Sequence, residues 1–156
     1  MEDRVSKRVS MKEMVPLIKE NIESGGESLF TPSGNSMYPM LRDRQDKVYI
    51  KAAHGYLKKY DLPLYERSEG IFVLHRVIKA KDGIYDMRGD NQFAIEKGIK
   101  HEQIIGVVSK FKRGDKLYKS NEISYILYTR LWVNTTLLRR LIRGLSRRVK
   151  SILRRN

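Results

Sequence analysis

Apolar residues recur along the chain with two different periods. In the first 30 residues they follow the three- and four-residue spacing of an amphipathic helix, at Met11, Val15, Ile18 and Ile22. Ser10 and Glu13 match the S-x-x-E capping box that begins a helix, and the Gly25-Gly26 pair is suited to end one. We therefore expect one helix here, with Pro16 as the point where it could bend.

From Ser28 onward the pattern changes to short runs of Val, Ile, Tyr and Phe between turn residues. The expected strands are Leu29–Thr31, Lys47–Lys51, Leu62–Tyr65, Ile71–Ile78, Gly83–Arg88 and Ile104–Phe111. Short strands joined by tight turns predict a mainly β domain that is small, strongly bent and mostly antiparallel. The N-terminal helix is expected to cover a sheet.

The strand pattern ends near Asn121, and the remainder predicts one or two helices. An apolar stripe with arginines opposite it is formed by Leu138, Leu141, Ile142, Leu145, Val149, Ile152 and Leu153. Three parts are therefore expected: a helical segment at 1–27, a β-domain at 28–118 and a basic amphipathic helical tail at 119–156.

The net charge of +14 is concentrated in this tail. Residues 123–156 hold nine Lys or Arg and no Asp or Glu, which leaves 23 basic and 18 acidic residues, or +5, for residues 1–122. An excess of positive charge favours an anionic membrane or a nucleic acid as a partner. The alternative for the tail is a helix that packs its apolar stripe on the β-domain and exposes its arginines to water.

Other features of the composition exclude classes of protein. The chain has no cysteine, which removes disulfides, thiol catalysis and cysteine metal sites. No spacing of His, Asp and Glu suggests a metal site, and we expect no cofactor. The sequence shows neither the apolar core of a signal peptide nor about 18 consecutive apolar residues, so we expect no transmembrane helix.

The candidate chemistry begins at Ser36, in Ser33-Gly34-Asn35-Ser36-Met37-Tyr38-Pro39. Gly34 allows a sharp turn and Pro39 prevents a helix from continuing, so the turn holds one hydroxyl at a defined angle. A serine needs a base and oxyanion donors to act as a nucleophile. By itself the heptapeptide is better interpreted as an ordinary Gly/Ser/Pro turn.

Three later motifs change this balance: Lys58-Lys59-Tyr60-Asp61-Leu62-Pro63-Leu64-Tyr65, His75-Arg76-Val77-Ile78 and Gly89-Asp90-Asn91. Together with the Ser36 motif, and in the same order, they resemble the serine peptidases that comprise type I signal peptidases and LexA-like self-cleaving repressors. The resemblance covers roughly residues 28–110. Because histidine stands where one branch has lysine, the chain is similar to the histidine branch, which includes endoplasmic-reticulum and SipW-like signal peptidases.

This resemblance implies a bent, SH3-like β core with Ser36 as nucleophile and His75 as general base. It also implies a carboxylate that orients His75. Glu96 is the first candidate by position, where the family uses aspartate, and Asp90 is the second. The chain departs from the family at Glu96 and at Tyr60, where glycine is usual.

Each candidate also has an ordinary structural interpretation. His75 could be a core histidine, Asp90 could form an Asx turn, and Glu96 could be a solvated surface residue. One oxyanion donor is expected from the backbone N–H of Ser36. The second is unassigned, with Ser33 or an amide near Gly34 as the candidates.

We therefore expect a serine endopeptidase that cleaves a leader or signal-like peptide through an acyl-enzyme. The tail is expected to hold it at the inner face of an anionic membrane, in the cytoplasm. The alternative from another class is a catalytically weak or inactive binding module on the same fold. A basic nucleic-acid-binding protein is a third interpretation, disfavoured because exposed aromatics are not interleaved with the basic residues of the tail.

Overall fold

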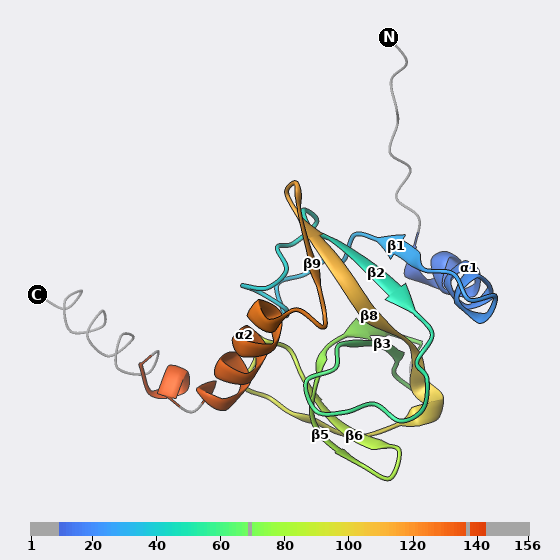
Figure 1. The fold of residues 1–156 in the computed structure, drawn as a ribbon. Helices are drawn as coiled ribbons and strands as arrows, with labels where there is room; N and C mark the ends of the chain where they lie inside the picture. Colours follow the sequence, from blue (N-terminus) through green and yellow to red (C-terminus); the bar gives the residue numbers. More distant parts are fainter. Residues whose placement is uncertain (1–9, 69, 137, 143–156) are drawn as a thin grey trace, which may run out of the picture.

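The computed structural model describes residues 10–68, 70–136 and 138–142, and it shows two antiparallel sheets with a helix on either side (Figure 1). The helices are α1 (Met11–Glu23), η1 (His101–Gln103) and α2 (Ile123–Asn134). The strands are β1 (Ser28–Phe30), β2 (Lys47–Lys51), β3 (Pro63–Glu66), β4 (Phe72–Leu74), β5 (Arg76–Lys81), β6 (Ile84–Arg88), β7 (Glu96–Lys100), β8 (Ile104–Arg113) and β9 (Lys116–Lys119).

The larger sheet has the order β1-β2-β8-β3-β4, with β9 also paired to β8, and the smaller sheet has the order β5-β6-β7. All of the strand pairs in the described residues are antiparallel. The expectation of a mainly β, antiparallel fold is therefore confirmed. Within the described part of the chain the strands form two sheets and do not close into one barrel, so the SH3-like core is not established.

The N-terminal helix forms as its sequence predicts. Ser10 caps α1, the N–H of Glu13 donates to the Ser10 hydroxyl at 3.3 Å, and the Ser10 N–H donates to the Glu13 carboxylate at 3.0 Å. Pro16 lies inside the helix without ending it. The buried face of α1, formed by Val15, Ile18 and Ile22, belongs to the same core cluster as the larger sheet.

One predicted strand is wrong in a way that matters for the site. Residues 71–78 form two strands rather than one, because β4 pairs with β3 in the larger sheet and β5 pairs with β6 in the smaller sheet. His75 is the residue at which the chain passes from one sheet to the other. Sequence reasoning also missed β7 and β9, which carry more lysine than a half-buried strand usually does.

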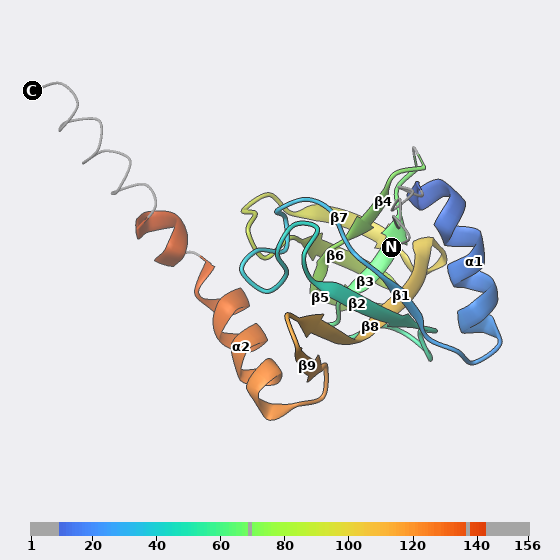
Figure 2. The ribbon, with the colours of Figure 1, turned by 90° about the horizontal axis from the view of Figure 1, so that it is seen from above.

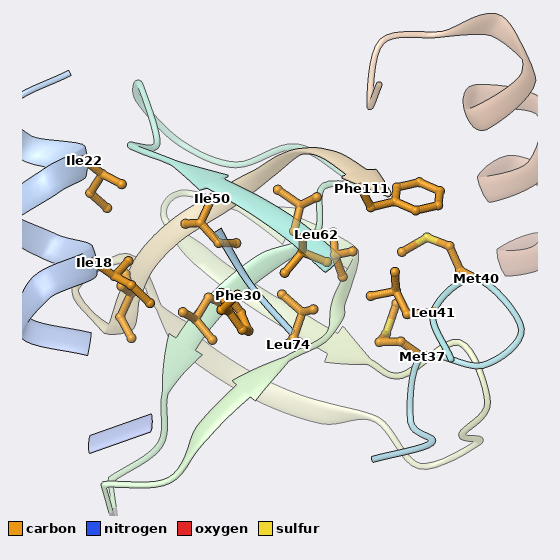
Figure 3. Close-up of a cluster of buried hydrophobic side chains, with 14 of the residues drawn as sticks. Ile18, Ile22, Phe30, Met37, Met40, Leu41, Ile50, Leu62, Leu74 and Phe111 are labelled. Atoms are coloured by element: carbon orange, nitrogen blue, oxygen red, sulfur yellow. The ribbon is translucent and has the colours of Figure 1, made fainter. Parts of the chain in front are cut away.

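The loop after Ser36 is anchored in the main core. Met37, Met40 and Leu41 are each at most 4% exposed. They pack in one cluster with Leu74 and Phe111 (Figure 3). Burying a large apolar side chain contributes roughly 1.5–3 kcal/mol, so three such anchors fix the position of the loop.

Helix α2 lies on the opposite side of the β-domain from α1 (Figure 2). Its Ile123, Leu127 and Leu131 side chains are exposed to solvent. Its buried residues are Tyr125 and Thr129. Most of the predicted stripe, from Leu145 to Leu153, lies outside the described residues. Of the helices in the described part, none combines the length and apolar character that crossing a bilayer requires.

Candidate functional site

Ser36 and His75, predicted from separate motifs, line one cleft of about 250 Å³. Their neighbours explain why they meet. Met37 follows Ser36 and Leu74 precedes His75, and both are buried in the same core cluster (Figure 3). Packing of these two residues brings the predicted nucleophile and base to one place.

The Ser36 turn is also fixed through its backbone. The Asn91 N–H donates to the Ser36 carbonyl at 2.8 Å, and the Asn91 side chain donates to the Asn35 carbonyl at 3.1 Å. The Gly34 N–H donates to the Asp43 carboxylate at 2.6 Å, so it is already occupied as a donor. Among the described residues, the N–H and hydroxyl of Ser36 bond to no protein group, which leaves both available to a bound molecule.

His75 is 5% exposed and sits between the two sheets. Its Nδ1 lies 3.3 Å from the Tyr65 hydroxyl. Burial, assisted by the positive charge of Arg67, lowers the pKa of His75 to about 4, while Glu96 and Asp90 oppose that shift. The imidazole is therefore neutral at pH 7, as a general base must be before it accepts a proton.

Glu96, the first candidate for orienting His75, reaches the ring through Tyr65. The Tyr65 hydroxyl donates to Glu96 Oε2 at 2.7 Å. Arg67 binds the same carboxylate through two of its guanidinium nitrogens, from Nε to Oε1 at 2.8 Å and from Nη2 to Oε2 at 2.6 Å. Burial alone would raise the pKa of Glu96, but the bonds from Arg67 and Tyr65 outweigh it and hold the pKa below the ordinary value. Tyr65 and Arg67 were not anticipated as site residues.

Asp90, the second candidate, binds Arg76 instead. Arg76 Nε donates to Asp90 Oδ1 and Nη2 donates to Oδ2, each at 2.8 Å. The two side chains are 0% and 2% exposed. The carbonyl of Asp90 accepts from Trp132 Nε1 at 2.7 Å, which connects this turn to α2. The carboxylate of Asp90 thus has a structural partner other than His75.

Arg76 is the central residue of this buried network. Its Nη1 donates to the Tyr125 hydroxyl at 2.9 Å and to the Tyr60 carbonyl at 3.1 Å, and its Nη2 lies 3.0 Å from the sulfur of Met40. Burial opposes the charge, but Tyr125 and Asp90 outweigh it and raise the pKa of Arg76. An arginine in an apolar strand is the sequence signal that could have indicated a buried ion pair.

Tyr60, one of the two departures from the family pattern, has a backbone φ of +83°. This left-handed conformation costs a non-glycine residue roughly 1–2 kcal/mol. The position therefore keeps a conformation that glycine adopts without strain. Its N–H donates to the Val77 carbonyl at 2.8 Å, which fixes the turn beside β5.

In the described part of the domain, two other hollows are larger than the cleft. One of about 670 Å³ adjoins the cleft, because Arg67, His75 and Gln92 line both. Another, of about 550 Å³, lies between residues 51–62 and α2, and none of the four predicted site residues lines it. Within the described residues, no group of three His, Asp or Glu side chains has the arrangement of a metal site.

Comparisons with known proteins do not identify a family. No protein-family model matches the chain, and no curated protein matches it. The likeness to the signal peptidases therefore depends on the four sequence motifs.

Proposed function

We propose that this protein is a serine endopeptidase of the signal-peptidase type, with Ser36 as nucleophile and His75 as general base. One observation carries the proposal: two residues 39 positions apart, in separate motifs, line one cleft. Among the described residues the Ser36 hydroxyl has no hydrogen-bond partner, and His75 Nδ1 lies 3.3 Å from the Tyr65 hydroxyl. The proposal includes the bent β core of that family.

The proposed reaction uses groups that face the cleft. His75 accepts the Ser36 hydroxyl proton as Oγ attacks the carbonyl carbon of the peptide bond, and the backbone N–H of Ser36 is available to the resulting oxyanion. His75 then returns the proton to the leaving amine, which leaves an acyl-enzyme. Water, activated by the same imidazole, hydrolyses that ester and releases the acid product.

A peptide is a suitable substrate for the surroundings of the cleft. Strand β4 is the last strand of the larger sheet, and Phe72, Val73 and Leu74 line the cleft. An edge strand offers backbone hydrogen bonds to an extended chain. We propose a leader or signal-like peptide as substrate, a specificity that comes from the family resemblance alone.

The second candidate is a binding module that has lost catalysis. It is favoured by the Ser36 hydroxyl, which makes no hydrogen bond to His75 among the described residues, and by the low basicity that burial gives His75. In that case the cleft would hold a peptide without cleaving it. Covalent capture of Ser36 separates the two candidates.

The experiment uses p-nitrophenyl acetate, which acetylates an activated serine, followed by intact-mass spectrometry and peptide mapping between pH 6 and 9. We expect an acetyl group on Ser36 in the wild type and its loss in Ser36→Ala and His75→Ala. Ser120→Ala is the matched control, because Ser120 lines the separate hollow of about 550 Å³ and should leave the adduct unchanged. Absence of a Ser36 adduct in the folded protein would favour the binding module.

We also propose that the protein binds an anionic membrane surface through residues 123–156, which begin with α2. Six apolar residues in this region are between 53% and 76% exposed: Ile123, Leu127, Leu131, Leu138, Leu141 and Ile142. The first three are spaced four residues apart along α2, so they lie on one face. The nine basic residues and absence of acidic ones in residues 123–156 complement a negatively charged bilayer. A peripheral position at the inner face of a membrane remains part of this proposal.

A further inference from the structure

The hydroxyl proton of Tyr65 has a defined destination. Tyr65 is 0% exposed, and its hydroxyl lies 2.7 Å from Glu96 Oε2 and 3.3 Å from His75 Nδ1. Glu96 is ionised, because Arg67 pairs with both of its oxygens, and a carboxylate can only accept. The single proton of Tyr65 therefore goes to Glu96.

This assignment determines the protonation of the histidine. With its proton committed to Glu96, the Tyr65 oxygen presents only lone pairs to His75 Nδ1, so the bond between them requires a proton on Nδ1. A neutral imidazole carries one ring proton. Its Nε2 is then left with a free lone pair, which is the form that a general base requires.

A second Tyr–His pair in the same protein has the opposite arrangement. The Tyr85 hydroxyl lies 2.9 Å from His101 Nδ1, but its oxygen accepts the Leu57 N–H at 3.1 Å. Because the other partner of Tyr85 is a donor, its hydroxyl proton is free to go to Nδ1 of His101. Neutral His101 should therefore carry its ring proton on Nε2, although both rings contact a tyrosine through Nδ1.

We propose that Tyr65 is a positioning residue. Because its hydroxyl donates its only proton to Glu96, it can only accept a hydrogen bond from His75, and this keeps His75 in its Nδ1–H form. The assignment of the ring proton follows from the contacts alone, whereas its catalytic value rests on the proposed peptidase function. In the direct carboxylate–histidine pair expected from the sequence, the negative charge also stabilises the imidazolium. Here a neutral hydroxyl intervenes and Arg67 neutralises Glu96, so the arrangement orients the ring while contributing little stabilisation to its charged form.

The test is long-range ¹H–¹⁵N correlation NMR of the ring nitrogens at pH 7, which distinguishes the two neutral forms of histidine. The chain has three histidines, so the spectrum can be assigned by substitution. We expect the Nδ1–H form for His75 and the Nε2–H form for His101. An Nε2–H form for His75 in the wild type would overturn the proposal.

Two variants test whether Glu96 determines the protonation of His75 through Tyr65, and a third variant serves as a control. Glu96→Ala removes the acceptor and frees the Tyr65 proton, so His75 should change to the Nε2–H form. Tyr65→Phe removes the partner, so the preference of His75 for Nδ1–H should be lost. Tyr85→Phe should alter His101 and leave His75 unchanged. Persistence of the Nδ1–H form in folded Glu96→Ala would contradict the proposal even if Tyr65→Phe failed to fold.

The rate of Ser36 acetylation gives the catalytic readout. Loss of one orienting hydrogen bond, worth about 1.4 kcal/mol, corresponds to roughly a tenfold slower reaction in Tyr65→Phe. An unchanged acetylation rate in that variant would overturn the positioning role. If the NMR result is as expected but Ser36 is never acetylated, the peptidase function fails and the protonation pattern stands. If Ser36 is acetylated but His75 has the Nε2–H form, only the role of Tyr65 fails.

Discussion

Gly89 lies directly against the backbone of Ser36. A Cβ built on Gly89 would fall 2.6 Å from the Ser36 carbonyl oxygen and 3.1 Å from the Ser36 Cβ. The glycine of the Gly89-Asp90-Asn91 motif is therefore required for close approach of two loops that are far apart in sequence. This contact explains how a turn without a catalytic side chain can affect the nucleophile.

Gly89→Ala should displace Ser36 and slow its acetylation by about tenfold or more, since small misplacements of reacting groups are costly. Gly114→Ala is the control. Its φ is +59° and an added Cβ would meet no atom within 4 Å, so it should reduce stability by roughly 1 kcal/mol without affecting Ser36. Equal acetylation rates in the two variants would show that the Gly89 contact is unimportant.

Asp90→Asn should lower the free energy of unfolding by about 3–5 kcal/mol, because it leaves the buried charge of Arg76 without its anionic partner. Urea denaturation measures the change. The double variant Arg76→Met/Asp90→Leu should recover much of the loss, because no unpaired charge remains buried. If Asp90→Asn is as stable as the wild type, the ion pair is not a structural element.

The free energy of unfolding should decrease as the pH is lowered, in part because of His75. Its pKa is about 4 when folded, against an ordinary 6.5, so the unfolded chain binds more protons between these values. The contribution is complete above pH 6.5 and declines as the pH falls toward 4, by about 2 kcal/mol between pH 7.5 and 5. His75→Ala should lack this part of the decline. Parallel curves for the two proteins would contradict the lowered pKa.

The rate of Ser36 acetylation should be maintained at a lower pH than is usual for a histidine base. A histidine base with a pKa of about 4 is still deprotonated at pH 5.5, where one titrating at its ordinary value would be mostly protonated. The rate should therefore remain nearly constant from pH 7.5 to 5.5. A decline centred near pH 6.5 would mean that the site raises the basicity of His75 above what its burial implies.

Binding to vesicles of phosphatidylcholine with phosphatidylserine should depend on the exposed face of α2. Leu127→Gln and Leu131→Gln, at side chains 62% and 69% exposed, should each weaken sedimentation with vesicles at least tenfold while preserving the fold. Leu117→Gln, at an exposed leucine on β9, is the matched control and should have no effect. Vesicles without phosphatidylserine, or high salt, should also weaken binding.

Two other results would change the function that we assign to this surface. Retention of binding in the two leucine variants would exclude α2 as the membrane contact. Salt-sensitive binding to single-stranded RNA or duplex DNA, with no vesicle binding, would favour the nucleic-acid interpretation of the tail.

The sequence by itself determined the features that depend on neighbouring residues. The capping box and the apolar spacing predicted α1, and short β-branched runs predicted most of the strands, because helix caps and strand propensities act over a few residues. The motifs also selected Ser36 and His75 as candidates before any fold was known. Their catalytic roles stay predictions, but their placement on one cleft is a property of the structure.

Only the tertiary structure decided how the site is assembled. The break between β4 and β5 at His75 follows from pairing with two different sheets, which no local pattern records. The contacts of Tyr65 with His75 and Glu96 join positions 10 and 31 residues apart, and the pairing of Asp90 with Arg76 joins positions 14 apart. Such contacts depend on where the two sheets place their side chains, so the partners of each carboxylate became visible only in three dimensions.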